Sequence, residues 1–304
     1  MKRFALACFL AAFLSMPVIA APKYQYLSIA DCTLAIEWRG EFSPGQKDRL
    51  TEWLITVMTT TSLLNGELPR EEIRIVLQPY AGRGAVPFAR ILRQQPEGVL
   101  FYVDPDEPVS AFVEDWTAYH ELSHLFIPYP GNNDIWFSEG LASYYQNVLQ
   151  GRANLLTRDE AAAKLAAGFE RGKNDDSHAR LTLGELSPVM REKRAFMRVY
   201  WSGALYFLTA DIALRRLPPD APRPRTLDGV LREFAACCLM QTRNWTGMAI
   251  AAEFDRIAAT NLFTTLYRQF ELSRALPEPA KMLAAPELDA ILEPQNLNQS
   301  LAVQ

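Results

Sequence analysis

The chain has 304 residues, of which 49% are hydrophobic and 22% are charged. This balance is typical of a globular protein and excludes a disordered or collagen-like chain. With 31 basic and 35 acidic residues the net charge is −4, so the sequence lacks the basic footprint of a nucleic-acid-binding protein. The length allows one large domain or two small ones.

Residues 1–20 have the pattern of a secretory signal peptide. Lys2 and Arg3 form a positive n-region, an apolar run covers 4–14, and small residues around Ala20 form a cleavage site. The run is too short and wrongly flanked for a spanning helix, and no later stretch has the roughly 18 apolar residues of a membrane span. We therefore expect an exported protein, periplasmic in a bacterium or secreted, with an uncleaved anchor as the alternative. Its mature chain would carry a net charge of −6, because two basic residues leave with the signal.

The mature chain keeps three cysteines, Cys32, Cys237 and Cys238. An odd number allows at most one internal disulfide. Cys237 and Cys238 lie in an apolar helical segment, which favours buried thiols. The sequence leaves open whether Cys32 pairs with Cys237 or with Cys238.

Residues 21–109 predict a small α+β lobe with a mixed sheet. Alternation or apolar runs predict strands at 33–38, 73–77 and 98–103, the last buried on both faces. Ser43 followed by Pro44 is a helix-start signal, and the apolar positions that follow have helical spacing.

Residues 110–276 predict a mainly helical lobe. The pattern gives helices over 110–127, 134–149, from about 157, and over 194–216, 227–240, 246–259 and 261–274. The segment 277–304 is rich in Pro and Ala and is expected to be a loosely ordered tail. The catalytic or binding unit would therefore span 21–276.

Two of the three histidines lie four residues apart, in the H-E-x-x-H pattern His120-Glu121-Leu122-Ser123-His124. On a helix, positions i and i+4 differ by about 40° in direction and about 6 Å in rise, so both imidazoles can bind one Zn²⁺. Glu121 is rotated by about 100° and would sit beside the metal as a general base for a water molecule.

A catalytic zinc needs a third protein ligand, and Glu139 is the candidate. It lies inside the apolar segment 135–145, where an ionised carboxylate is costly unless it is paired. The turn at 128–131 would bring this second helix back against the first, with Glu139 opposite His120 and His124. His178 lies in a polar loop and is expected to be a surface histidine.

These residues resemble a family. His120-Glu121-x-x-His124 followed by Trp136-x-x-Glu139-Gly140-x-x-x-Tyr144 is similar to the gluzincin zinc metallopeptidases, most of all to the glycyl aminopeptidases and more distantly to the alanyl-aminopeptidase-like enzymes. Tyr200-Trp-Ser-Gly203-Ala is similar to the family's later Tyr-x-x-Gly-Ala segment.

The resemblance implies a thermolysin-like bilobal catalytic domain that hydrolyses peptide bonds with one zinc ion. It implies His120, His124 and Glu139 as the ligands, Glu121 as the general base, and Tyr200 as the donor to the oxyanion of the tetrahedral intermediate. Peptides or proteins would be the substrates, and their backbone is expected to pair with strand 98–103 as an edge strand.

The Gly-x-Met-Glu-Asn stretch of the alanyl-aminopeptidase-like enzymes is not visible before the zinc helix. The segment 98–102 occupies its place and has no carboxylate to hold a free amino terminus. The sequence leaves three points open: action on chain ends or interiors, substrate preference and oligomeric state. A catalytically degenerate zinc-binding relative, acting as a peptide-binding or structural module, is the alternative function, and a metal-free helical protein is the third.

Overall fold

The computed structural model describes residues 23–29, 31–64, 66–218, 220 and 224–295. The expected signal peptide at 1–20 lies outside this part of the chain. Among the helices that the structure describes, none combines the length and the apolar character needed to cross a membrane.

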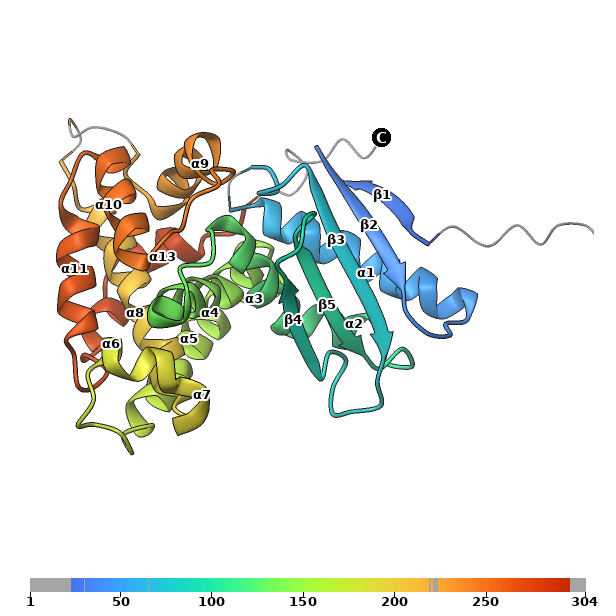
Figure 1. The fold of residues 1–304 in the computed structure, drawn as a ribbon, viewed down its shortest axis with the longest axis horizontal. Coiled ribbons are helices and arrows are strands. Elements are labelled where there is room, and N and C mark those ends of the chain that lie inside the picture. The colour runs from blue at the N-terminus through green and yellow to red at the C-terminus, as the bar shows by residue number, and fades with distance from the viewer. Residues whose placement is uncertain (1–22, 30, 65, 219, 221–223, 296–304) are drawn as a thin grey trace, which may run out of the picture.

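One mixed five-stranded sheet forms the N-terminal lobe, in the order β1-β2-β3-β5-β4 (Figure 1). Strand β2 pairs parallel with β3 and β3 parallel with β5, while β1 and β4 run antiparallel at the two edges. The strand bounds are β1 Gln25–Ile29, β2 Cys32–Trp38, β3 Glu72–Pro79, β4 Phe88–Leu92 and β5 Gly98–Val103.

Helix α1, Pro44–Ser62, packs against the sheet as its apolar spacing predicts. It begins with a capping box in which Ser43 and Gln46 bond each other's backbone N–H groups, so two helix-end donors are satisfied. Its Trp53 is fully buried and meets Phe101 of β5 edge-on, with ring centroids 5.2 Å apart.

The prediction of 98–103 as a strand buried on both faces is confirmed, but the expectation that it forms the sheet edge is wrong. Strand β5 lies between β3 and β4, so both of its backbone edges are used. The edge nearest the helical lobe is β4, which the sequence analysis did not predict (Figure 1). This strand has only five residues, and only two of them carry apolar side chains that point inward. The hydrophobic pattern is therefore too short to predict a strand.

The rest of the described chain is helical, as expected. Short 3₁₀ turns lie at 124–126, 132–134 and 187–189. The helices are α2 Val109–Glu114, α3 Thr117–Ser123, α4 Ile135–Arg152, α5 Arg158–Asn174, α6 Leu183–Leu186, α7 Met190–Lys193, α8 Phe196–Arg215, α9 Leu227–Cys237, α10 Gly247–Ala258, α11 Leu262–Glu271, α12 Ala280–Leu283 and α13 Glu287–Leu292.

The helix expected over 110–127 is two helices. Asp115 adopts an extended conformation with φ −68° and ψ 130°, and its side chain accepts a hydrogen bond from Thr117 N at 2.8 Å. An aspartate that bonds the backbone two residues ahead favours a turn over a continuing helix. Helix α3 therefore begins afresh just before the paired histidines.

Helices α4 and α8 cross closely in the middle of the helical lobe (Figure 1). Gly140 of α4 faces Gly203 of α8, and a Cβ atom added at Gly140 would lie 2.4 Å from the backbone of Gly203. Only glycine at both positions permits this approach. Glu139 lies next to Gly140, and Tyr200 lies three residues before Gly203. The crossing therefore fixes how far apart Glu139 and Tyr200 lie.

The tail expected to be loosely ordered contains α12 and α13. Leu288, Ile291 and Leu292 of α13 are buried, and the buried Arg152 donates from Nε to the carbonyl of Ile291 at 2.8 Å. The spacing i, i+3 and i+4 places these three side chains on one helix face, which packs against α4. The Pro-rich composition concealed this pattern.

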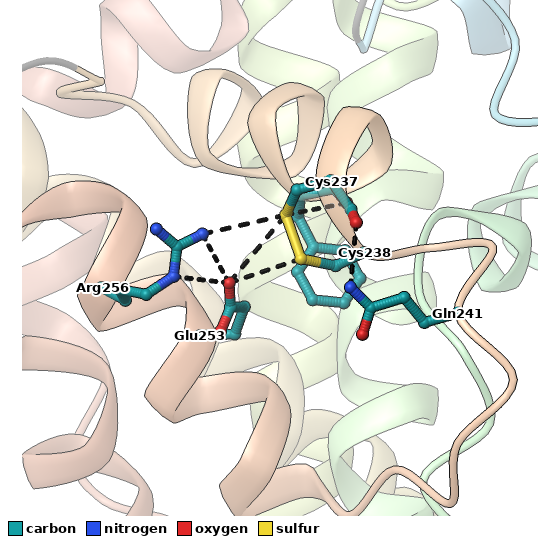
Figure 2. The surroundings of a disulfide bond; sticks show 6 residues. Cys237, Cys238, Gln241, Glu253 and Arg256 are labelled. Carbon is teal, nitrogen blue, oxygen red and sulfur yellow. Dashed lines mark hydrogen bonds and ion pairs between the residues drawn. A yellow bond between two sulfur atoms is a disulfide. The ribbon is translucent and has the colours of Figure 1, made fainter.

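The cysteines do not pair as the open alternatives supposed. Adjacent Cys237 and Cys238, at the end of α9, form a disulfide with each other (Figure 2). Cys237 is exposed, so the expectation of two buried thiols is also wrong. Cys32 is a buried free thiol at the start of β2, in the other lobe, and its burial raises its pKa to about 12.

Candidate metal centre

The end of α3 presents the two histidines to the interior. His120 lies in the helix and His124 in the 3₁₀ turn that follows, yet the four-residue spacing keeps both on one side, with ring centroids 5.0 Å apart. Both side chains are buried, at 3% and 4% exposure. The predicted pairing of the imidazoles is therefore present.

Helix α4 brings Glu139 to the same point. Its Oε2 lies 3.2 Å from Nε2 of His120 and 3.5 Å from Nε2 of His124, and one ligand atom from each of the three residues lies within 4.8 Å of the others. The 14 residues between His124 and Glu139 suffice because the chain reverses tightly, with Gly131 at φ +87°. The structure thus brings together all three residues expected to bind metal.

Two further side chains orient the imidazoles. Gln146 Oε1 lies 2.9 Å from Nδ1 of His120, and Ser138 Oγ lies 2.9 Å from Nδ1 of His124. Such partners hold the ring of a metal-binding histidine and leave Nε2 toward the ion. The sequence analysis missed both residues, although Ser138 precedes Glu139 and Gln146 follows it by seven positions, on the same face of an apolar helix.

The donor set fits a divalent cation. His120 is flanked by two hydrogen-bond acceptors, Gln146 Oε1 and Glu139 Oε2, whereas a neutral imidazole donates only once. A positive charge at Nε2, from a proton or a metal ion, is needed to satisfy this arrangement. Two imidazoles and one carboxylate are ligands that Zn²⁺ accepts, with a fourth position left open.

The charges in the site act strongly on one another. Burial alone would raise the pKa of Glu139, but the imidazoles of His124 and His120 hold it far below its usual range. Burial alone would lower the pKa of His120, yet the Glu139 and Glu121 carboxylates raise it overall. The cluster therefore favours an ionised Glu139 carboxylate next to positive charge at the imidazoles.

Glu121 and Tyr200 stand beside the three ligands. Glu121 lines the same cleft, and its burial raises its pKa, which the two neighbouring imidazoles offset only in part. The ring of Tyr200 stacks on His120 with centroids 5.8 Å apart and an interplanar angle of 20°. Burial and the nearby carboxylates of Glu139 and Glu121 raise the pKa of Tyr200 well above its usual value, so its hydroxyl stays protonated.

All five side chains open onto one cleft of about 970 Å³ between the lobes. Its walls are edge strand β4, helices α3 and α4, and the segment around α7 and the start of α8. Trp116 and Tyr200, whose rings both contact His120, also line a smaller adjoining pocket of about 400 Å³.

Two other features lie outside the cleft. His178 bonds through Nε2 to the carbonyl of Lys193 at 3.1 Å and does not line the cleft. Cys237, Cys238 and Glu253 form a second compact group of metal-ligating residue types, with Glu253 Oε1 3.3 Å from the sulfur of Cys238 (Figure 2). Because the two sulfurs are bonded to each other, this group has no thiolates to offer a metal.

The fold is similar to part of the fold of M1 zinc metallopeptidases. A crystal structure of an M1 zinc metallopeptidase from Deinococcus radiodurans is similar with a TM-score of 0.51 and 17% identity, over 88% of this chain and 53% of that one. An aminopeptidase N family protein from Idiomarina loihiensis is similar with a TM-score of 0.52 and 16% identity, over 91% of this chain and 48% of that one.

A third similar structure is a variant of the Deinococcus radiodurans enzyme bound to a Tyr-Ser-Ala substrate, with a TM-score of 0.50 and 18% identity, over 84% of this chain and 53% of that one. The chain thus spans about half the length of these structures. Among the curated proteins, a sequence search finds no match.

By sequence, a family model matches part of the chain. The model of the M61 glycyl aminopeptidase family matches residues 128–205, which contain Glu139 and Tyr200. The resemblance stated from the sequence is therefore confirmed. The expected architecture of a small mixed sheet followed by a helical lobe is also confirmed, whereas the finer comparison with thermolysin stays a prediction.

Proposed function

We propose that the protein is a zinc metallopeptidase that hydrolyses peptide bonds. The observation that carries this proposal is the convergence of His120, His124 and Glu139 on one point of an interlobe cleft, with the Glu121 carboxylate beside them. The match to a glycyl aminopeptidase model and the fold shared with M1 zinc metallopeptidases support it.

His120, His124 and Glu139 would hold one zinc ion. Bound zinc supplies Lewis acidity, which brings the pKa of a water molecule down to about 7 and polarises a carbonyl group. Gln146 and Ser138 keep the imidazoles in place through their Nδ1 atoms.

Glu121 would be the general base. It takes a proton from the attacking water and passes it to the nitrogen of the departing amine. Its burial favours the protonated form more than in a free glutamate, which suits a group that must hold the proton between two steps. The carboxyl therefore works as base and then as acid without leaving the cleft.

Tyr200 would stabilise the oxyanion that forms when water adds to the carbonyl. Its hydroxyl keeps its proton at neutral pH, because burial and two nearby carboxylates raise its pKa. A protonated phenol aimed into a buried site is a hydrogen-bond donor for developing negative charge.

Strand β4 would bind the substrate backbone. One edge of β4 pairs with β5, and no strand in the described part of the chain pairs with the other edge, which borders the cleft. An extended peptide can add to such an edge as a further antiparallel or parallel strand. This assignment replaces strand 98–103, which has no free edge.

Export to the periplasm or the cell exterior is also part of the proposal. It rests on the charge and apolar pattern of residues 1–20. Sequencing the amino terminus of the protein recovered from its native host tests it, because cleavage near Ala20 is expected.

The mechanism is tested with a peptide library profiled by mass spectrometry. Glu121→Gln should keep zinc and lose cleavage by several orders of magnitude, because the variant cannot take a proton. Glu114→Gln is the matched control, since Glu114 is exposed on α2 and does not line the cleft. Undiminished cleavage by Glu121→Gln would remove the mechanism, and zinc binding by the wild type without any cleavage would favour the non-catalytic relative.

A further inference from the structure

Outside the metal centre, the charged side chains that line the cleft are positive. Apart from the metal-centre residues Glu121 and Glu139, no carboxylate lines the main cleft or the adjoining pocket in the described part of the chain. Five cations line them instead: Arg90, Arg93 and Arg191 in the cleft, and Lys164 and Arg171 in the pocket. The whole chain carries a net charge of −4, so the cleft has the opposite polarity to the molecule.

These cations are available for a ligand. In the described residues, Arg90, Arg191, Lys164 and Arg171 form no ion pair within 4.0 Å, and Arg93 reaches Glu97 only at that limit. A concave site lined by one sign of charge concentrates ligands of the other sign. Guanidinium groups also suit carboxylates in particular, because their paired N–H donors match the two oxygens.

Arg191 and Arg93 are the best placed of the five. The Arg93 guanidinium lies over the ring of Tyr129, 4.8 Å from its centroid, and both residues line the cleft. Arg191 lies on α7, five residues before Phe196 and nine before Tyr200, and it lines the same cleft as Tyr129 and the metal centre. A substrate seated at the metal would therefore lie within a cleft that presents both guanidinium groups.

The described residues of the cleft also offer no free carboxylate that could bind a positively charged amino terminus. A free amino terminus needs a carboxylate, and among the described residues the only two that line the cleft belong to the metal centre, one as a ligand and one as the base. The edge strand β4, Phe88–Leu92, contributes Arg90 and no acidic residue. The lining residues therefore discriminate in favour of anionic substrates and against substrates held by a positive terminus.

We propose that this site selects peptides that carry a carboxylate near the scissile bond, and that Arg191, assisted by Arg93, binds that carboxylate. The inference rests on the peptidase function proposed above and names its substrate class. The carboxylate comes either from an acidic side chain or from the free carboxyl end of a short peptide, since both present the same group to a guanidinium.

Four versions of one peptide test the proposal, with Glu or Gln beside the scissile bond and a free or amidated carboxyl end. A hydrogen bond to a charged group contributes enough that the preferred anionic peptide should exceed its neutral counterpart about 10- to 100-fold in kcat/KM. The preference should reside mainly in KM and shrink as salt rises from low to high concentration. The pair of peptides that shows it identifies the source of the carboxylate.

Arg191→Gln should reduce this preference to near one, because kcat/KM falls for the anionic peptide far more than for the neutral one. Arg194→Gln is the matched control, because Arg194 is exposed, lies three residues away and does not line the cleft. Binding of the same peptides to zinc-loaded Glu121→Gln, measured by calorimetry, should show the same order without any turnover. Equal kcat/KM for anionic and neutral peptides, or an unchanged preference in Arg191→Gln, would overturn the proposal. If the wild type cleaves neither kind of peptide yet binds the anionic one more tightly, the peptidase function fails and the charge selectivity stands.

Discussion

The contact between Gly140 and Gly203 gives the most discriminating prediction about how the fold holds the site. The two glycines let α4 and α8 touch through their backbones, immediately beside Glu139 and close to Tyr200. A Cβ atom at residue 203 would lie 2.1 Å from the carbonyl oxygen of Trp136 and 2.6 Å from Cα of Gly140. Because the obstacles are backbone atoms, the helices themselves must separate to admit even one methyl group.

For the variant Gly203→Ala, helix propensity and packing predict changes of opposite sign in the free energy of unfolding. Replacing a mid-helix glycine with alanine should stabilise a helix by roughly 0.5–1 kcal/mol. Overpacking in a dense core costs typically about 1–3 kcal/mol, and backbone obstacles favour the upper end. We expect a net loss near 2 kcal/mol, which in a chain of this size lowers Tm by roughly 3 °C.

The same change should disturb the site. A shift of about 1 Å between catalytic groups can cost on the order of 100-fold in rate. Calorimetric melting, zinc titration and peptide cleavage should therefore all worsen in Gly203→Ala. The control is Gly45→Ala on α1, where a Cβ atom meets nothing within 4 Å and slight stabilisation is expected. A Gly203→Ala protein with unchanged or higher Tm and unchanged zinc affinity would refute the reasoning.

Three further predictions follow from the site and its surroundings. Chelation should lower Tm, because an ion that binds only the folded state at 1,000 times its Kd stabilises it by about 4 kcal/mol; an identical melt with and without chelator would contradict this. Tyr200→Phe should lower kcat about 10²–10³-fold with little change in zinc content, whereas a full rate would remove the oxyanion role. Reduction of the Cys237–Cys238 disulfide should lower the free energy of unfolding by far less than the ~3 kcal/mol expected for a 15-residue loop, because adjacent residues close almost no loop, so Tm should barely change.

The metal centre could be predicted because its geometry is local. The spacing of His120 and His124 sets their common direction through helix geometry alone, even though the second histidine falls in a 3₁₀ turn. Glu139 was predictable because an acidic residue in so apolar a helix demands a partner, and a tight turn separates the two helices. Gln146 obeys the same logic, since a polar side chain two turns beyond Glu139 on a buried face needs a reason to be there.

The rest of the cleft depends on contacts between distant segments. Strand β4 is defined by its pairing with β5 and by an edge that faces the helices. Five residues of sequence predict neither feature. Arg93 follows that strand and Arg191 lies on a one-turn helix, so only the folded chain shows that both line one cleft. The disulfide escaped prediction because a pairing of neighbours leaves no trace in spacing.

The zinc content of the purified chain tests the central claim most directly. Elemental analysis after dialysis, combined with calorimetric titration of the metal-free protein, should give one zinc ion per chain, with the affinity lowered by several orders of magnitude in Glu139→Ala. A wild-type protein that takes up no zinc, or a Glu139→Ala variant that binds it as tightly as the wild type, would contradict the account.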